Sequence, residues 1–174
     1  MRKGTRDSSL KNFTKVLPKR GELNFKKEPQ IRPAKREDFY NIVSLEEICF
    51  KEENFNRKQL RYLLFKAKSI VFVALMDGKL IGSIIVLLRN HISNARIYSL
   101  DVHPAYRRRG VAGLLMDSAL EILKEKGYKK ITLEVGINNG EAQNLYKSKG
   151  FIKDKILYNY YKNGDDALHL VRKL

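Results

Sequence analysis

The sequence has little of what cross-links a chain or anchors it in a membrane. Cys49 is the only cysteine in 174 residues, so no disulfide within the chain and no cysteine metal site can form. We interpret Cys49 as a small buried side chain on a helix rather than a nucleophile. A chain without disulfides fits a reducing compartment, and we expect a cytoplasmic location.

Long apolar runs are also missing. The longest, residues 81–88, contains a glycine and a serine and is far too short to span a bilayer. The N-terminal region has no apolar core of the kind found in signal peptides. We therefore expect no contact with a membrane. The three histidines, His91, His103 and His169, are scattered without ligand spacing, which predicts that no metal is bound.

Acidic residues are outnumbered, with 19 Asp and Glu against 35 Lys and Arg, a formal net charge of +16. Such a field attracts polyanions, including nucleic acid, ribosomes and the phosphates of coenzyme A, although a lysine-rich proteome would give the same count. Residues 1–29 are basic and show no periodicity. We expect a flexible basic extension over residues 1–29 and one folded domain over residues 30–174.

Hydrophobic periodicity in residues 30–174 predicts an α/β fold with a mixed central sheet flanked by helices. The expected order is βααβββαβαββ. Its members are a strand at 30–33, helices opening at 36 and about 56, strands at 70–75, 80–88 and 95–102, a helix at 110–126, a strand at 131–135, a helix from 138 or 139 to 150, and strands at 151–161 and 167–174.

Residues 99–116 read as a strand, a turn and a helix. Pro104 ends the strand because it cannot donate to a ladder, and apolar residues recur at helical spacing from Val111. Three arginines and Gly110 lie between the two elements. Free N–H groups and the positive end of the helix dipole meet there, which is the chemistry of a pyrophosphate site. Gly110 and Gly113 leave room for a phosphate or for the neighbouring strand.

A second group of residues lies further along the chain. Glu134 falls between Leu133 and Val135 on the opposite face of its strand. It is either an acid on a wet sheet face or a functional residue. Tyr146 begins the pattern Tyr-x-x-x-Gly-Phe, seven residues after Asn139. The alternative for Tyr146 is ordinary core packing.

Together these segments resemble a known family. Arg107-x-x-Gly110-x-Ala112 resembles motif A of the GNAT acetyltransferase superfamily, and with the Glu134 and Asn139–Phe151 segments the chain resembles RimI-like N-terminal acetyltransferases from about residue 31 onward. The resemblance implies the GNAT fold, acetyl-CoA as co-substrate and a protein α-amine as acceptor. Ala112 in place of the commoner glycine and the 30-residue basic extension depart from the family pattern.

The resemblance also implies roles for individual residues. Glu134 would be the general base, Tyr146 the general acid, and Tyr98 would lie beside the substrate amine. The residues implied to bind acetyl-CoA are Leu100, Asp101, Val102, Arg107, Arg108, Arg109, Gly110, Val111, Ala112, Asn139 and Tyr146. Those implied to flank the acceptor peptide are Phe50, Phe55, Tyr160 and Tyr161.

Three functions remain open at this point. The first is direct acetyl transfer to a protein N-terminus, with a ribosomal protein as one candidate and without a metal. The second keeps the fold but takes a lysine side chain or a small amine as acceptor. The third is a ribosome- or RNA-associated module that binds coenzyme A without catalysis, reaching nucleic acid through its basic tail.

Overall fold

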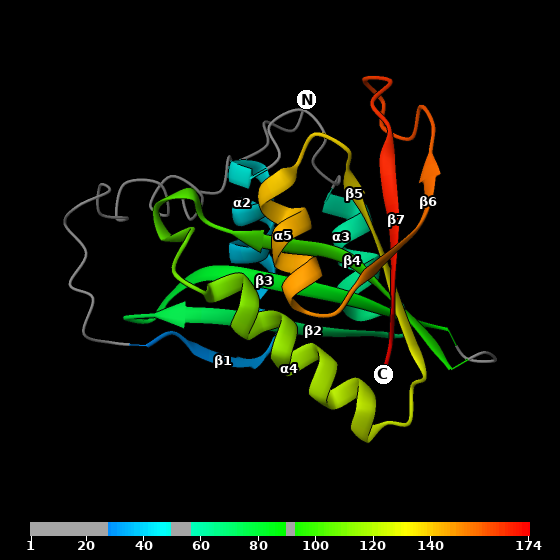
Figure 1. Ribbon diagram of the computed structural model, residues 1–174. Helices are drawn as coiled ribbons and strands as arrows, with labels where there is room; N and C mark the ends of the chain where they lie inside the picture. Colours follow the sequence, from blue (N-terminus) through cyan, green and yellow to red (C-terminus); the bar gives the residue numbers. More distant parts are fainter. Residues whose placement is uncertain (1–27, 50–56, 90–92) are drawn as a thin grey trace, which may run out of the picture.

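The computed structural model describes residues 28–49, 57–89 and 93–174, so most of the predicted extension lies outside it. The described residues form a seven-stranded sheet in the order β1-β2-β3-β4-β5-β7-β6 (Figure 1). The α-helices and strands follow the predicted order. They are β1 (Gln30–Pro33), η1 (Arg36–Asp38), α2 (Phe39–Cys49), α3 (Arg57–Phe65), β2 (Ser69–Met76), β3 (Lys79–Arg89), β4 (Asn94–Val102), η2 (Pro104–Tyr106), α4 (Val111–Glu125), β5 (Lys130–Gly136), α5 (Gly140–Ser148), β6 (Ile152–Leu157) and β7 (Ala167–Lys173).

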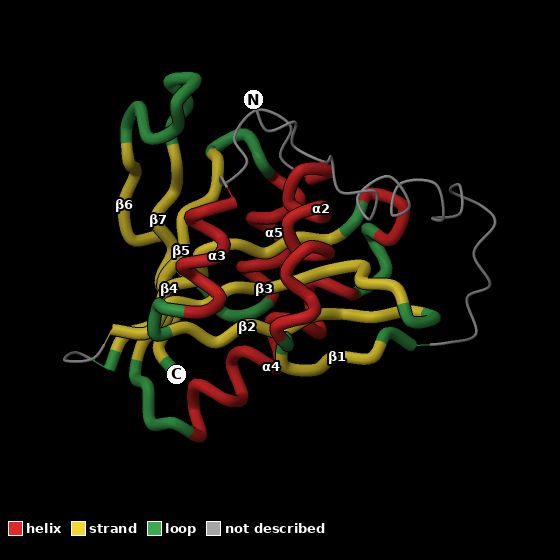
Figure 2. The backbone as a smooth tube through the Cα atoms, turned by 180° about the vertical axis from the view of Figure 1, so that it is seen from behind, coloured by secondary structure: helices red, strands yellow, loops and turns green. Residues whose placement is uncertain are grey.

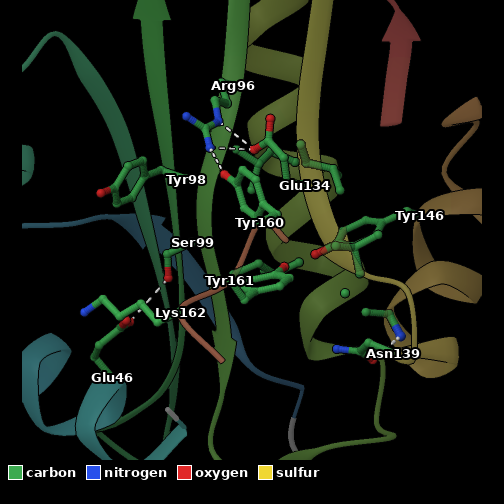
Figure 3. A pocket seen from close by; sticks show the side chains of 16 residues that line it. Glu46, Arg96, Tyr98, Ser99, Glu134, Asn139, Tyr146, Tyr160, Tyr161 and Lys162 are labelled. Atoms are coloured by element: carbon green, nitrogen blue, oxygen red, sulfur yellow. Dashed lines mark hydrogen bonds and ion pairs between the residues drawn. The ribbon is translucent and has the colours of Figure 1, made fainter. Parts of the chain in front are cut away.

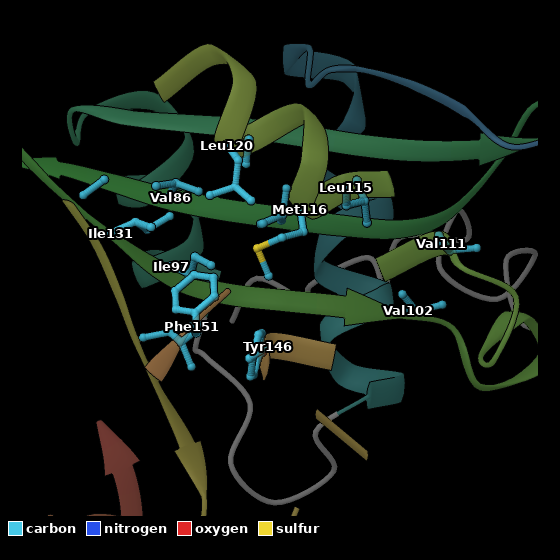
Figure 4. Close-up of a cluster of buried hydrophobic side chains, with 14 of the residues drawn as sticks. Val86, Ile97, Val102, Val111, Leu115, Met116, Leu120, Ile131, Tyr146 and Phe151 are labelled. Carbon is cyan, nitrogen blue, oxygen red and sulfur yellow. The ribbon is translucent and has the colours of Figure 1, made fainter. Parts of the chain in front are cut away.

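Helices cover both faces of the sheet (Figures 1 and 2). Buried side chains of α4 and α5, including Leu115, Met116 and Tyr146, share one core with the strands (Figure 4). On the other face, α2 and α3 close smaller clusters through residues such as Val43 and Leu60. The sheet is therefore the middle layer of three, and its central strand β4 touches both cores.

Strands β4 and β5 are parallel neighbours for only part of their length. Their register covers Asn94 to Arg96 of β4, whereas β4 stays paired with β3 as far as Val102. The two parallel strands therefore separate in the middle of the sheet. Side chains from both strands can enter this opening, and no ladder hydrogen bonds fill it over the described part of β4 beyond Arg96.

A β-bulge in β4 changes which way its side chains point. Ile85 pairs with Ser99 while Val86 pairs with Ile97, so Tyr98 is an extra residue. Because side chains alternate with period two, this insertion reverses the phase of the strand after Ile97. Leu100 and Val102 pack in the α4 core. Ser99 and Asp101 therefore face α2.

Some predicted boundaries are wrong. The strand predicted at 151–161 ends at Leu157. Asn159 has a φ of 50°, in the left-handed region, and the backbone N–H groups of Tyr160 and Tyr161 turn back to Asp165 O, so extended pairing cannot continue.

The helix predicted to open at Arg36 begins with a 3-10 turn and becomes α-helical at Phe39. Asp38 accounts for this, because its carboxylate accepts the Lys35 N–H at 2.7 Å and the Arg32 guanidinium. Between the two candidate caps of α5, the structure selects Asn139, whose Oδ1 accepts the Ala142 N–H at 3.1 Å.

Candidate active site

Two cavities adjoin where β4 and β5 separate. We call the first, of about 380 Å³, the aromatic cavity; four tyrosines line it, Tyr98, Tyr146, Tyr160 and Tyr161. We call the second, of about 440 Å³, the helix cavity, because it lies at the N-terminus of α4. Leu100, Asn139, Ala142 and Tyr146 line both cavities. A molecule could thus extend from one cavity into the other past Tyr146.

The helix cavity has the properties of an anion site. Gly110 caps α4 with a φ of 80°, a conformation that favours glycine. The first backbone bond of the helix is Leu114 N–H to Gly110 O at 3.0 Å, which leaves the N–H groups of Val111, Ala112 and Gly113 outside the helical ladder. These donors and the helix dipole favour a negatively charged ligand.

The three arginines of the turn differ in position and in the groups that they contact. Arg107 and Arg108 line the helix cavity, and Arg107 Nε donates to Val102 O at 3.1 Å. Arg109 is not among the lining residues; its guanidinium lies 5.7 Å from the ring centre of Tyr106. The turn therefore brings two of the three predicted guanidinium groups to the cavity.

The close approach of helix and sheet occurs at Gly82 and not at Gly113. A Cβ added at Gly82 would lie 3.0 Å from Asp101 O and 3.1 Å from Leu115 Cδ1. A Cβ at Gly113 would meet only the Lys149 side chain, at 3.6 Å. The expectation that Gly113 makes room for a strand is wrong, and sequence reasoning did not single out Gly82.

Glu134 lies in the aromatic cavity as part of an ion pair (Figure 3). Arg96 Nε donates to Glu134 Oε2 at 2.7 Å, and Arg96 Nη2 donates to the Tyr160 hydroxyl at 2.9 Å. Burial alone would lower the pKa of Arg96, but the charge and hydrogen bond of Glu134 raise it. Arg96 was missed by the sequence analysis, since its partner lies 38 positions away.

The other oxygen of Glu134 faces a histidine. His169 Nε2 lies 3.9 Å from Glu134 Oε1, and His169 Nδ1 contacts Asp154 Oδ2 at 3.0 Å. Asp154 is the extra residue of a bulge in β6. His169 is thus a half-buried neighbour of the site, which its isolated place in the sequence did not indicate.

Tyr146 is buried, with 9% of its surface exposed, and packs edge-on against Phe151 at 5.9 Å. Burial, and then the charge of Asp101, raises the pKa of Tyr146. The phenol therefore stays protonated near neutral pH and can act as a hydrogen-bond donor.

Tyr98 lies across the aromatic cavity from Tyr146, and its hydroxyl accepts a hydrogen bond from Gln59. Burial raises the pKa of Tyr98, although the Gln59 hydrogen bond acts in the opposite direction. Tyr160 and Tyr161 line the same cavity with their rings edge-on at 5.1 Å. The structure thus brings Glu134, Tyr146, Tyr98, Tyr160 and Tyr161 together in the wall of one cavity, and the roles assigned to them stay predictions.

Two buried acids lie on the α2 side of the opening. Glu46 is 1% exposed and Asp101 is 2% exposed. Ser99 Oγ donates to Asp101 Oδ2 at 2.7 Å and lies 3.4 Å from Glu46 Oε2. Burial, followed by the charge of Glu46, raises the pKa of Asp101 well above its ordinary value. The Asp101 carboxyl therefore holds a proton at pH values where an exposed one has lost it.

Cys49 lies beside this pair. Its Sγ donates to Val102 O at 3.5 Å, and burial raises the pKa of Cys49 to about 12. The thiol stays protonated near neutral pH, which fits the interpretation that it is not a nucleophile.

Other predictions fall outside what the structure describes. Phe50 and Phe55 lie outside the described residues.

Within residues 28–49, 57–89 and 93–174, no group of three or more His, Cys, Asp and Glu side chains could hold a metal ion. In the same segments, no helix is both long and apolar enough to cross a membrane.

Comparison with known proteins identifies the family of this chain. Residues 36–151 match the model of the family described as Acetyltransferase (GNAT) family. The chain belongs to this family. N-alpha-acetyltransferase 30 of Schizosaccharomyces pombe is 31% identical over 140 residues, which cover 76% of this chain and 93% of that protein. N-alpha-acetyltransferase MAK3 of Arabidopsis thaliana is 38% identical over 112 residues, which cover 63% of this chain and 59% of that protein.

Solved GNAT structures superimpose on the sheet and helices. A structure described as the NatC complex bound to Gag peptide and CoA contains a chain 26% identical to this one, with a TM-score of 0.76. The alignment covers 85% of this chain and 99% of that one. Ribosomal-protein-S18-alanine N-acetyltransferase from Escherichia coli, 23% identical, has a TM-score of 0.77 over 84% of this chain and 94% of that chain, which confirms the GNAT fold.

Proposed function

We propose that this protein transfers the acetyl group of acetyl-CoA directly to the α-amine of a protein N-terminus. The observation that carries the proposal is the junction of the two cavities at Tyr146, between an anion site and a cavity lined by acids and tyrosines. The chain's membership in the GNAT family supports acetyl-CoA as donor. The names of its S. pombe and Arabidopsis relatives support a protein α-amine as acceptor.

The helix cavity suits the pyrophosphate of acetyl-CoA. Arg107, Arg108 and the backbone from Gly110 to Ala112 line it, and Asn139 and Leu100 continue its wall toward the aromatic cavity. We assign Asp101 a place in the wall rather than a direct contact with phosphate, because its carboxyl is buried against Ser99. Arg109 then contributes long-range charge only.

The backbone of β4 can hold the acetyl-bearing end. His103 N–H donates to Ile81 O at 2.9 Å. Because successive N–H groups of a strand point to opposite edges, the Val102 N–H points toward the opening between β4 and β5. A fixed N–H there can stabilise negative charge that develops on the thioester oxygen during attack. Acetyl-CoA supplies the acetyl group, and coenzyme A leaves as the thiol.

Glu134 and Tyr146 act on the two ends of the transfer. An α-amine has a pKa of about 8, so roughly a tenth of it is neutral at pH 7. Glu134 accepts a proton from the nitrogen as it attacks. Arg96, which also donates to the Tyr160 hydroxyl, holds the carboxylate in place. Tyr146 directs its protonated hydroxyl to the departing sulfur. Tyr98 lies across the cavity, beside the incoming amine.

Tyr160 and Tyr161 line the aromatic cavity and would flank the first residues of the acceptor peptide. A ribosomal protein is one candidate acceptor, because a Bacillus subtilis relative, 31% identical over 79% of this chain, is named a putative ribosomal protein bS18-alanine N-acetyltransferase. The net charge of +16 favours contact with the ribosome or nucleic acid. Such a reaction would take place in the cytoplasm.

The proposal is tested by incubating the protein with acetyl-CoA and peptides that differ only in their first two residues. Mass spectrometry then locates the acetyl group. A matched peptide with a blocked N-terminus and one internal lysine tests the competing acceptor. We expect acetyl only on free α-amines; acetylation of the lysine alone would reassign the acceptor. Repeating the assay with and without RNA separates catalysis from a binding role.

A further inference from the structure

The buried acids Glu46 and Asp101 are not used by the mechanism above, yet they form part of the site. Glu46 and Ser99 line the aromatic cavity, while Asp101 lines the helix cavity. The pair therefore lies in the wall between the two cavities, with Glu46 on α2 and Asp101 on β4. Figure 3 shows Glu46 bonded to Ser99 on the side of the cavity away from Glu134.

The cluster is built in a way that stability alone does not require. Burying two carboxyl groups side by side is costly, since each loses hydration and each repels the charge of the other. Asp101 is paired in register with Ser83 of β3. The Ser83 hydroxyl is fully buried and has no hydrogen-bond partner among the described residues. The cluster thus keeps unused hydrogen-bonding capacity at Ser83, beside the Asp101 carboxyl.

We propose that the Glu46 carboxylate, positioned by Ser99 and Asp101, binds the acceptor α-amine and takes the proton that its ammonium form must lose before attack. This inference rests on the proposed transfer to a protein N-terminus and assigns it a residue for recognition of the amine. Asp101 is a positioning residue, acting through Ser99 and Glu46.

The proton balance separates this role from that of Glu134. The ammonium R–NH3+ gives one proton to the Glu46 carboxylate and becomes R–NH2. As the neutral nitrogen attacks the thioester carbon, its second proton passes to Glu134, the carbon–sulfur bond breaks, and Tyr146 protonates the sulfur. Glu134 then returns a proton to Tyr146, and Glu46 releases its proton to solvent when the acetylated product leaves.

The charged and titratable groups around the pair fit this role. They are Cys49 on α2, Tyr98 on β4, Arg107 beyond β4, Tyr146 on α5, and Arg96, Glu134, Tyr161 and Lys162 in the wall of the aromatic cavity. Raised pKa values keep Cys49, Tyr98 and Tyr146 protonated and neutral near pH 7. Burial, followed by the charge of Glu46, raises the pKa of Asp101, and we assign the negative charge of the pair to Glu46.

This arrangement favours an α-amine over a lysine side chain. The pKa of an α-amine is about 8 and that of lysine about 10.4, so removing a proton from lysine is harder by roughly 300-fold. The Glu46 carboxylate has the same basicity toward either amine. It can therefore deprotonate the first kind of amine far more readily than the second.

The experiment compares Glu46→Gln with Glu47→Gln, a neighbouring acid on the same helix that is exposed and paired with Arg57 at 3.6 Å. The kcat and KM for a free-amine peptide are measured from pH 6 to pH 9. For Glu46→Gln we expect kcat/KM to fall by about 10²-fold at pH 6–7 and to recover toward pH 9, where the amine is already neutral. The affinity of Glu46→Gln for acetyl-CoA should equal that of the wild-type protein. Glu47→Gln should keep the wild-type kcat/KM across the pH range. Ser99→Ala, which keeps both acids, should show a smaller loss with the same recovery.

Binding is measured separately by calorimetry, with CoA present, using a free-amine peptide and its Nα-acetylated form. The wild-type protein should prefer the free amine, and Glu46→Gln should lose that preference. A Glu46→Gln protein with the wild-type pH profile and preference would overturn the inference while leaving the proposed function standing. A wild-type protein that shows no preference for the free amine would also overturn it. Glu46-dependent binding without acetylation would instead support the inference and overturn the proposed function.

Discussion

The buried carboxyl of Asp101 should make the stability of this protein depend on pH in a defined direction. Its pKa is raised by burial and by Glu46 in the folded state, and an unfolded aspartate has a pKa of about 3.9. Between these two values the folded protein holds a proton that the unfolded chain has released. The free energy of unfolding therefore falls as pH rises through this window, and it is highest below pH 4 as far as this group is concerned.

The size of the effect follows from the linkage relation. One group that binds a proton only in the folded state changes the free energy of unfolding by about 1.4 kcal/mol per pH unit. Asp101→Asn removes the titrating group, keeps nearly the same shape and can still accept a hydrogen bond from Ser99. The variant should therefore gain stability relative to the wild-type protein as pH increases, approaching this slope until Asp101 loses its proton in the folded state.

Urea unfolding of both proteins from pH 5 to pH 8 measures this difference directly. The matched control is Asp117→Asn, because Asp117 is 57% exposed on α4 and paired with Lys149 at 2.6 Å. Its difference from wild type should stay small over the whole range, since an exposed ion pair contributes little to stability. Parallel curves for the wild-type protein and Asp101→Asn over this range would show that Asp101 is not held protonated, and the reasoning about the buried pair would fail.

Three further outcomes are expected. Glu134→Gln should lower kcat by roughly 10²–10⁴ without changing acetyl-CoA affinity, as measured by initial rates and calorimetry; an unchanged kcat would make Glu134 a structural partner of Arg96. Gly110→Val should abolish acetyl-CoA binding in a calorimetric titration, because a β-branched residue resists the φ of 80° that shapes the anion site; undiminished affinity would remove that site. A protein starting at Gln30 should keep peptide turnover and lose salt-sensitive binding to RNA, and a folded truncation without turnover would contradict this separation.

The order of elements could be predicted because local signals agree with the fold. Alternating apolar residues mark the strands, and two turn signals mark boundaries within a few residues. They are the Asp77-Gly78 turn between β2 and β3, and Gly127, which follows the Lys126 C-cap of α4. The anion site was also predictable, since its parts lie within one short stretch ending at Ala112. The prediction of the strand after Phe151 was wrong because the turn begins earlier than expected, with the backbone N–H groups of Tyr160 and Tyr161 bonded to Asp165 O.

The rest of the site depends on contacts between distant positions. Arg96 meets Glu134 across the opening of the sheet, and neither residue alone indicates the other. Glu46 did leave a signal that was missed. It follows Phe39, Ile42 and Val43 at helical spacing, so an acid occupies the centre of an apolar stripe. An acid at such a position, when a second acid such as Asp101 falls in a central strand, predicts a buried polar cluster.

The bulge at Tyr98 links the fold to the chemistry. Without the extra residue, alternation would turn Ser99 and Asp101 into the α4 core and carry Leu100 and Val102 to the α2 side. With it, one strand presents Ser99 and Asp101 to α2 and the apolar Leu100 and Val102 to α4, while its backbone faces the opening. Asp101, which we propose positions Glu46, and the Val102 backbone, which we propose holds the thioester, are thus adjacent residues of β4. This short segment of β4, and not a flexible loop, then fixes where the Asp101 carboxyl that positions Glu46 lies relative to the thioester.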